Sequence, residues 1–406
     1  MFNRLLIVLL LVCPALPVGA QDTNAKSEKL DALNLLEDKL RQHPEVQAYI
    51  HRAESARLQA DGELGLPDPM LFIQEQDYPI GSSRSQDQEE KMIGVKQTIP
   101  AFGTRSAKSE KNIVEGRKTK LQGEFAFAAM RAKLIQTLAD WQRNQEQKKI
   151  LATQSELLRS EQLSLQGRIA ANQSKSSLLA MSRVDSTDIE LMRTGLEEEQ
   201  HEIMAMLTNM VGNVPNIVLP PIEMQPWHDD PEQTYPVRIA ATDIDMANKD
   251  VDLREAEFNP SLEFQSSYGR MHNGDNAGTV MLGLSIPIWA EQSQKPKLAS
   301  AKAGLRAAET DKDNIQRQVL EKLSHLEAQI SASTIKIDLL KHKGSLLGAT
   351  GSAQTREYEA GKAEFAMPLK TRRDMLSVRY QLAAEQAKHT ALVADFNHYI
   401  IQGEAE

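Results

Sequence analysis

The chain has 406 residues, a formal net charge of −9, 5% aromatic residues and one cysteine. A chain of this length has room for two or three domains. Its acidic balance, without a basic face or arm, argues against sequence-independent binding to nucleic acid.

The first twenty residues are typical of a secretory signal. Arg4 precedes the apolar run Leu5–Val12, and the small residues Val18-Gly19-Ala20 form a cleavage site before Gln21. We therefore predict a signal peptide over residues 1–20 and export from the cytoplasm. Cys13 lies inside this signal, so the exported chain is expected to lack disulfides and zinc–thiolate sites. Lipid attachment at Cys13 stays open, although Val12 is bulkier than a lipoprotein signal normally has at that position.

Two long proline-poor stretches, 104–171 and 295–360, are predicted as helices. The first has no proline and is rich in Ala, Leu, Gln, Glu, Lys and Arg. Apolar residues recur every seven positions, as at Leu151, Leu158 and Leu165. This spacing predicts coiled-coil-like packing against neighbouring helices.

The order of elements occurs twice, which predicts an internal duplication. The first structural repeat, 21–213, contains a helix beginning near Pro44, a β-hairpin over 70–99, the long helix 104–171 and a helix over 176–212. A linker with five prolines, 214–231, follows. The second repeat, 232–406, contains a helix from Tyr235, a hairpin over 261–288, the long helix 295–360 and a helix over 362–402. Landmarks such as Gly94 and Gly283 lie about 190 residues apart.

The predicted strands alternate between apolar and polar residues. Over 279–288, Val280, Leu282 and Leu284 alternate with Met281 and Gly283. Such alternation over about ten residues occurs in transmembrane β-strands, and an ordinary half-buried sheet produces the same pattern. The membrane interpretation is favoured because every helix is already committed to the coiled coil. Four strands cannot close a barrel, and unpaired sheet edges are unstable in lipid. Several chains would therefore have to contribute strands to one barrel.

Aromatic residues lie near the ends of these strands, where membrane-interface aromatics are expected. The aromatic residues are Tyr78, Phe102, Tyr268 and Trp289. For Trp289, packing between a helix and a strand is an equally good interpretation.

In its order of motifs the chain resembles the TolC-type outer-membrane efflux protein family. The resemblance rests on the duplication, on His43-Pro44, on the segment from Gln97 to Arg105, on Leu284–Trp289 and on Tyr358-Glu359-Ala360-Gly361. The amino-acid sequence of the segments Leu66–Met70 and Ile99–Arg105 is most similar to that of the heavy-metal-efflux branch, the outer component of cobalt–zinc–cadmium or copper–silver pumps.

The resemblance implies a mainly α-helical fold with a transmembrane β part. Duplicated helical hairpins would form a periplasmic α-barrel, and four strands per chain would form a 12-stranded barrel in a homotrimer. It also implies outer-membrane lipid around the barrel, a periplasmic adaptor (membrane fusion) protein and an inner-membrane RND-type pump as partners. The protein would then lie in the cell outer membrane and extend into the periplasm.

The resemblance further assigns residues to the periplasmic tip. Those expected to contact the adaptor are Arg168, Asn172, Ser174, Tyr358, Gly361 and Lys362. Those expected near a gate are Glu364, Met367, Lys370, Arg373 and Asp374. Met367 and Lys370 occupy positions where the best-studied relatives carry carboxylates, so an acidic, cation-selective gate is not predicted here.

Catalytic chemistry is not predicted from the sequence. The nine histidines are scattered, without a metal-binding HExxH motif. Trp227–Asp230 is interpreted as a solvated loop and Met204, Met206 and Met210 as packing residues. We predict no enzyme activity, no cofactor and no resident metal, and a passive exit duct in a tripartite efflux system, with heavy-metal cations as cargo. The alternatives are a duct for drugs or type I secretion, and a soluble periplasmic coiled-coil scaffold.

Overall fold

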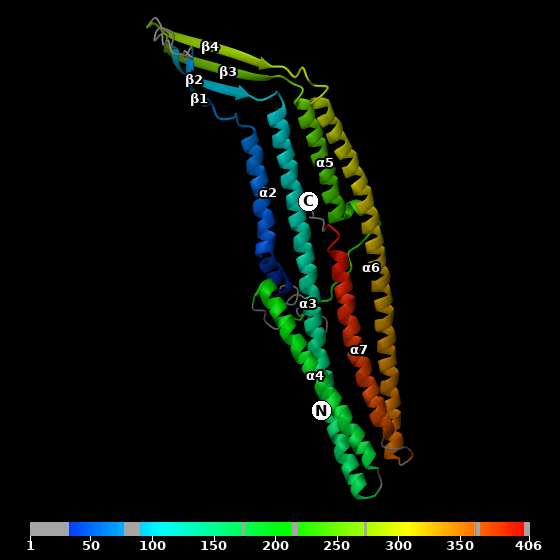
Figure 1. Ribbon diagram of the computed structural model, residues 1–406. Coiled ribbons are helices and arrows are strands. Elements are labelled where there is room, and N and C mark those ends of the chain that lie inside the picture. The colour runs from blue at the N-terminus through cyan, green and yellow to red at the C-terminus, as the bar shows by residue number, and fades with distance from the viewer. Residues whose placement is uncertain are drawn as a thin grey trace, which may run out of the picture. The chain divides into compact units, whose positions relative to one another are not determined.

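The computed structural model describes residues 32–76, 90–172, 175–212, 218–271, 274–360, 362 and 366–401 (Figure 1). The predicted signal peptide, Cys13 and most of the loop that follows residue 76 lie outside this part.

Helices dominate the described chain, as predicted. The labelled helices are α2 (Pro44–Glu63), α3 (Thr104–Ala170), α4 (Ser176–Val211), α5 (Tyr235–Ala256), α6 (Gln294–Glu359) and α7 (Ala366–Asn397). Residues 32–41 are also helical. Within the described residues, no helix is both long enough and apolar enough to cross a membrane.

Local chemistry sets several helix ends. At the start of α2, His43 Nδ1 accepts a hydrogen bond from the Glu45 N–H at 3.3 Å, and Pro44 occupies the first turn. After α3, Asn172 has a positive φ of 61°, and Gly212 ends α4 with a φ of 76°. Asparagine and glycine tolerate this left-handed region, which stops a helix.

The four strands form one antiparallel sheet in the order β1-β2-β3-β4 (Figure 1). They are β1 (Met70–Gln76), β2 (Glu90–Ile99), β3 (Ser261–Arg270) and β4 (Asn276–Ser285). The two predicted hairpins join through β2 and β3, whose register runs from Lys91 opposite Arg270 to Ile99 opposite Leu262. β1 and β4 are therefore the two edges.

The last strand lies three residues earlier than the predicted 279–288. Just before it, the Gly274 N–H donates to the Met271 carbonyl at 3.0 Å, and Gly274 has a φ of +88°. The strand can then begin at Asn276. Pro287 lacks an N–H for ladder pairing, so the chain leaves the sheet before residue 288.

The last helix is also shorter than the predicted 362–402. It begins at Ala366 and ends at Asn397. The following residues pair with the segment before α5: the Tyr235 N–H donates to the Tyr399 carbonyl at 3.0 Å, and the Ile401 N–H to the Gln233 carbonyl at 2.9 Å. These strand-like bonds replace helical ones.

The compact units of the chain cut across the two sequence repeats. One, the sheet unit, contains the described residues of 41–133, 224–335 and 392–401. The other, the helical unit, contains those of 32–40, 134–223 and 336–391. Each repeat contributes to both units because its long helix passes through both. The boundaries of the compact units therefore differ from those of the sequence repeats.

Candidate functional site

One face of the sheet in the sheet unit is apolar and exposed. The strand register places most of the apolar side chains on the same face of all four strands. Their exposed fractions run from 41% for Phe264 to 84% for Ile73. The exposed members are Leu71, Ile73, Ile93, Phe264, Tyr268, Val280, Leu282 and Leu284. A contiguous apolar surface of this kind marks an interaction with lipid or protein.

The opposite face of the sheet is mostly polar. Lys96 on β2 pairs with Glu263 on β3, with Nζ and Oε1 2.8 Å apart. The Ser267 hydroxyl lies 3.6 Å from the Met92 sulfur. Gly94 is buried here, and a Cβ added to it would lie 2.5 Å from Phe72 Cζ and 2.7 Å from the Ser266 carbonyl oxygen. The Phe72 ring thus takes the space that a side chain at position 94 would need.

Three of the four predicted interface aromatics lie in the described chain and are exposed. Phe102 is 53% exposed, Tyr268 59% and Trp289 69%. Phe102 lies in the turn before α3 and Trp289 in the turns before α6. Tyr78 lies outside the described residues, and the membrane role of all four stays a prediction.

In the helical unit the four helices pack in the order α4, α3, α7, α6. Leu151 and Leu158 of α3 form a buried cluster with Ile189 and Leu196 of α4. On its neighbouring flank α3 contacts α7 through Ile150, Leu157, Leu369 and Leu376. α7 in turn meets α6, where the Thr371 hydroxyl donates to Gln354 Oε1 at 2.7 Å.

The two outer helices of this wall, α4 and α6, carry exposed apolar residues. On α4, Met181, Val184 and Leu191 are 60–67% exposed. At about 100° per residue, Val184 and Leu191 lie roughly opposite the Ile189–Leu196 seam and Met181 lies on the flank beside it. On α6, Leu339 is 62% and Leu346 55% exposed. We call these the α4 stripe and the α6 stripe.

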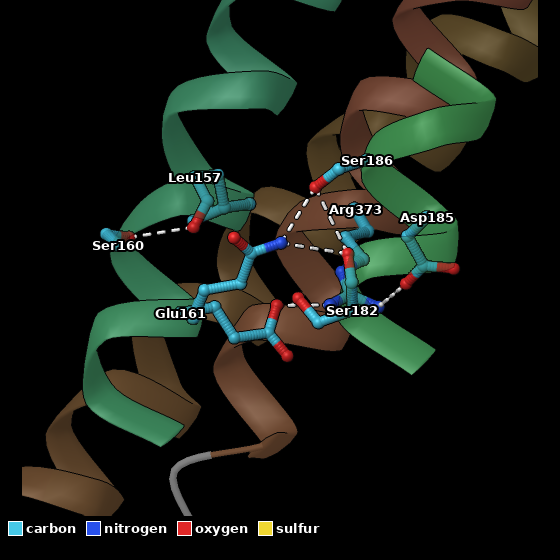
Figure 2. A network of polar contacts seen from close by, with 8 residues as sticks. Leu157, Ser160, Glu161, Ser182, Asp185, Ser186 and Arg373 are labelled. Atoms are coloured by element: carbon cyan, nitrogen blue, oxygen red, sulfur yellow. Dashed lines mark hydrogen bonds and ion pairs between the residues drawn. The ribbon is translucent and has the colours of Figure 1, made fainter. Parts of the chain in front are cut away.

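A polar network ties α3, α4 and α7 together inside this wall (Figure 2). Arg373 donates to Asp185 Oδ2 at 3.1 Å and also to a carboxylate oxygen of Glu161. Gln162 Nε2 donates to the Ser186 hydroxyl at 2.8 Å and to the Ser182 carbonyl at 3.0 Å. The network therefore links α7 of the second repeat to two helices of the first, α3 and α4.

The sequence predicted Arg373 as a gate residue but did not indicate that Glu161 and Asp185 are its ion-pair partners. The partners lie on two other helices, and nothing in their spacing indicates the contact. In this chain the Arg373 guanidinium lies between helices, and its side chain is 31% exposed.

The other predicted tip and gate residues are exposed where they are described. Arg168 lies in the last turn of α3, Tyr358 in the last turn of α6 and Met367 in the first turn of α7. Lys362, Lys370 and Asp374 are exposed as well. Asn172 lies at the turn after α3. Ser174, Gly361 and Glu364 lie outside the described residues, and the tip and gate roles stay predictions.

A buried aromatic cluster in the sheet unit contains a titratable histidine. His398 stacks on Phe125, with ring centroids 5.6 Å apart, and lies 4.1 Å from the Tyr399 ring centroid. Burial lowers the pKa of His398 below its usual 6.5, and Asp395, whose Oδ1 lies 3.5 Å from Nδ1, partly offsets this.

The described residues contain no group of three His, Cys, Asp or Glu side chains able to hold a metal ion. At the predicted loop Trp227–Asp230, Asp230 Oδ1 instead accepts the Glu232 N–H at 3.1 Å and caps a short 3-10 turn.

Comparison with known proteins finds one matching protein family and several solved structures of similar fold. Residues 235–394 match the family described as outer membrane efflux protein. No curated protein sequence matches the chain.

Solved structures match along nearly the whole chain. The outer membrane protein VceC from Vibrio cholerae is 15% identical, with a TM-score of 0.73 over 91% of this chain and 97% of its own. CusC, studied for folding and transmembrane channel formation, is 13% identical, with a TM-score of 0.74 over 90% and 91%. The open state of the Neisseria gonorrhoeae MtrE outer membrane channel is 14% identical, with a TM-score of 0.75 over 90% and 88%. The chain thus has the fold of solved outer-membrane channels, and its second half matches the outer membrane efflux protein family.

Proposed function

We propose that the protein is the outer-membrane duct of a tripartite efflux system, in which three chains form a tunnel across the periplasm and the outer membrane. The duct is passive, so the chain needs no catalytic centre. An adaptor protein at the tip and a proton-driven inner-membrane pump supply the cargo and the energy.

The observation that carries this proposal is the exposed apolar face of a four-stranded sheet with two unpaired edges. In water such a face and such edges promote aggregation. In lipid the apolar face is stable, but the edges must pair. Pairing β1 of one chain with β4 of the next satisfies both conditions, and three chains give twelve strands.

The helical unit supports the same assembly. Its outer helices carry the α4 and α6 stripes on opposite ends of the four-helix row. A head-to-tail ring would pack the α4 stripe of one chain against the α6 stripe of the next, and a ring of this kind closes without leaving either stripe exposed.

Membrane fractionation combined with a mass measurement tests this assembly. We expect the exported protein to need detergent for extraction from the outer membrane and to have the mass of a trimer. Recovery as a soluble monomer in the osmotic-shock fluid would contradict the duct and favour a periplasmic coiled-coil scaffold.

For the cargo we propose heavy metals, on the resemblance of Leu66–Met70 and Ile99–Arg105 to the heavy-metal branch. Deletion of the gene should sensitise cells to copper, silver, zinc, cobalt or cadmium. Sensitisation to antibiotics alone would favour a drug duct, and loss of a secreted polypeptide would favour type I secretion.

A further inference from the structure

The end of the helical unit is basic although the chain as a whole is acidic. Residues 165–180 and 350–375, which contain the ends of α3 and α6 and the starts of α4 and α7, have seven lysines and arginines against four aspartates and glutamates. The whole chain has a formal charge of −9. The charge of this end therefore has the opposite sign to that of the protein.

Most of these cations are not neutralised within the chain. Arg168, Lys175, Arg356, Lys370 and Arg372 are all exposed. Among the residues that the structure describes, none of the five has an ion-pair partner. Arg373 differs, because Glu161 and Asp185 both hold it.

The packing of α7 places two of the free cations on opposite sides of the helical wall. Leu369 and Leu376 face α3, and Thr371 faces α6. At about 100° per residue these contacts occupy two opposite flanks of α7. Lys370 falls on one of the remaining faces and Arg372 on the other. One of these faces must line the bore of a closed ring, so either Lys370 or Arg372 faces the bore.

The neighbouring charges do not cancel both cations. Asp374 is exposed one turn beyond Lys370, but no contact joins the two. On the face of Arg372 the next exposed charge is another cation, Arg379. Three copies in a ring would triple this positive charge around the bore.

We propose that the periplasmic mouth of the duct is anion-selective, with Lys370 or Arg372 as the selecting residue. This inference rests on the duct proposed above. Rings of lysine or arginine favour anions in a pore, because they attract anions and repel cations. The cargo is then an anionic or neutral species. A metal would pass more readily as such a complex than as a bare cation.

Ion selectivity in planar lipid bilayers tests this assignment. Purified full-length trimer is inserted between two KCl solutions of different concentration, and the reversal potential gives the chloride-to-potassium permeability ratio. We expect wild type to favour chloride by about two- to five-fold, the range set by a few exposed charges under salt screening. Lys370→Glu and Arg372→Glu are compared with it.

Each variant is the matched control for the other. Only one of the two side chains faces the bore, so one variant should abolish or reverse the chloride preference and the other should leave it unchanged. Both residues are exposed, so neither variant loses packing, and the trimer mass of each checks its folding.

The other outcomes separate the inference from the duct. A conducting wild type that favours potassium would overturn the inference and leave the duct standing. A chloride preference unchanged in both variants would overturn the role of Lys370 and Arg372. A folded trimer without conductance would overturn the duct and the inference together.

Discussion

Arg373 on α7 and Asp185 on α4 lie 188 positions apart in the sequence, and the Arg373 guanidinium donates to Asp185 Oδ2 at 3.1 Å. Glu161 on α3, whose side chain is only 15% exposed, accepts from the same guanidinium. One arginine of the second repeat therefore holds two helices of the first repeat, α3 and α4 (Figure 2).

Replacing Arg373 by methionine should destabilise the helical unit. The half-buried Glu161 carboxylate would lose its charged partner, which costs about 1–3 kcal/mol for hydrogen bonds to charged groups. Thermal unfolding followed by circular dichroism should show a lower midpoint. Arg372→Met, one residue away and without an ion pair, is the matched control. An equal fall in both variants would show that the Arg373 network contributes nothing.

Gly94→Ala should disrupt the sheet, whereas Gly283→Ala should not. The new Cβ at position 94 would lie 2.7 Å from the Ser266 carbonyl oxygen, which cannot move without breaking the β2–β3 ladder. At position 283 the nearest atom, Glu263 Cβ, lies at an ordinary 3.5 Å. Overpacking of this kind costs about 1–3 kcal/mol. The yield of folded, membrane-inserted protein measures the difference, and equal yields would contradict the prediction.

Neighbouring residues on β4 test which sheet face meets lipid. Leu282→Lys should reduce outer-membrane assembly strongly, because lysine on the lipid face costs about 2–4 kcal/mol near the bilayer midplane. Met281→Lys places the same charge on the opposite, polar face and should be tolerated. Both positions are exposed in the single chain, Leu282 at 72% and Met281 at 46%. If Met281→Lys proved the more damaging, the lipid-facing side would be wrongly assigned.

The α4 and α6 stripes should be contacts between copies. Leu191→Lys and Leu339→Lys should each weaken the trimer, because each puts a charge into an apolar helix–helix seam. Leu163→Lys is the control, since Leu163 is 64% exposed on α3 outside both stripes. Native mass measurements in detergent give the trimer fraction. A trimer that survives both stripe variants would show that the ring closes elsewhere.

Stability should fall between neutral and mildly acidic pH because of His398. Its pKa is lowered in the folded state by burial, so the unfolded chain takes up the proton first. The stabilisation is complete above pH 6.5 and is lost as the pH falls from 6.5 towards the folded-state pKa.

The variant His398→Phe keeps the stacking on Phe125 and removes the titration, so its unfolding midpoint should depend less on pH between 7.5 and 5. His51→Gln, at an exposed histidine, should behave like wild type. The same pH dependence in His398→Phe and wild type would rule out this source.

Residue types and their local spacing were enough to predict the helices, the number of strands and the alternation of their faces. These features depend on residue type and local spacing: seven-residue apolar repeats give α3 and α6, and two-residue alternation separates Leu282 from Met281. Asn172 and Gly212 end helices because their backbones reach positive φ. Each of these effects acts within a few residues, so a sequence pattern records it.

Burial and side-chain pairing depend on contacts between distant segments, so they became visible only in the folded chain. Gly94 and Gly283 occupy equivalent positions in the two sequence repeats. Only Gly94 is buried, because β2 lies inside the sheet and β4 at its edge. In the same way, the sequence predicts Arg373 as a gate residue, and only the packing of α7 against α3 and α4 shows that it pairs with Glu161 and Asp185. The start of β4 depends on the hydrogen bonds of the 271–275 turn. Burial and pairing come from long-range packing, which the spacing of residues along one segment does not encode.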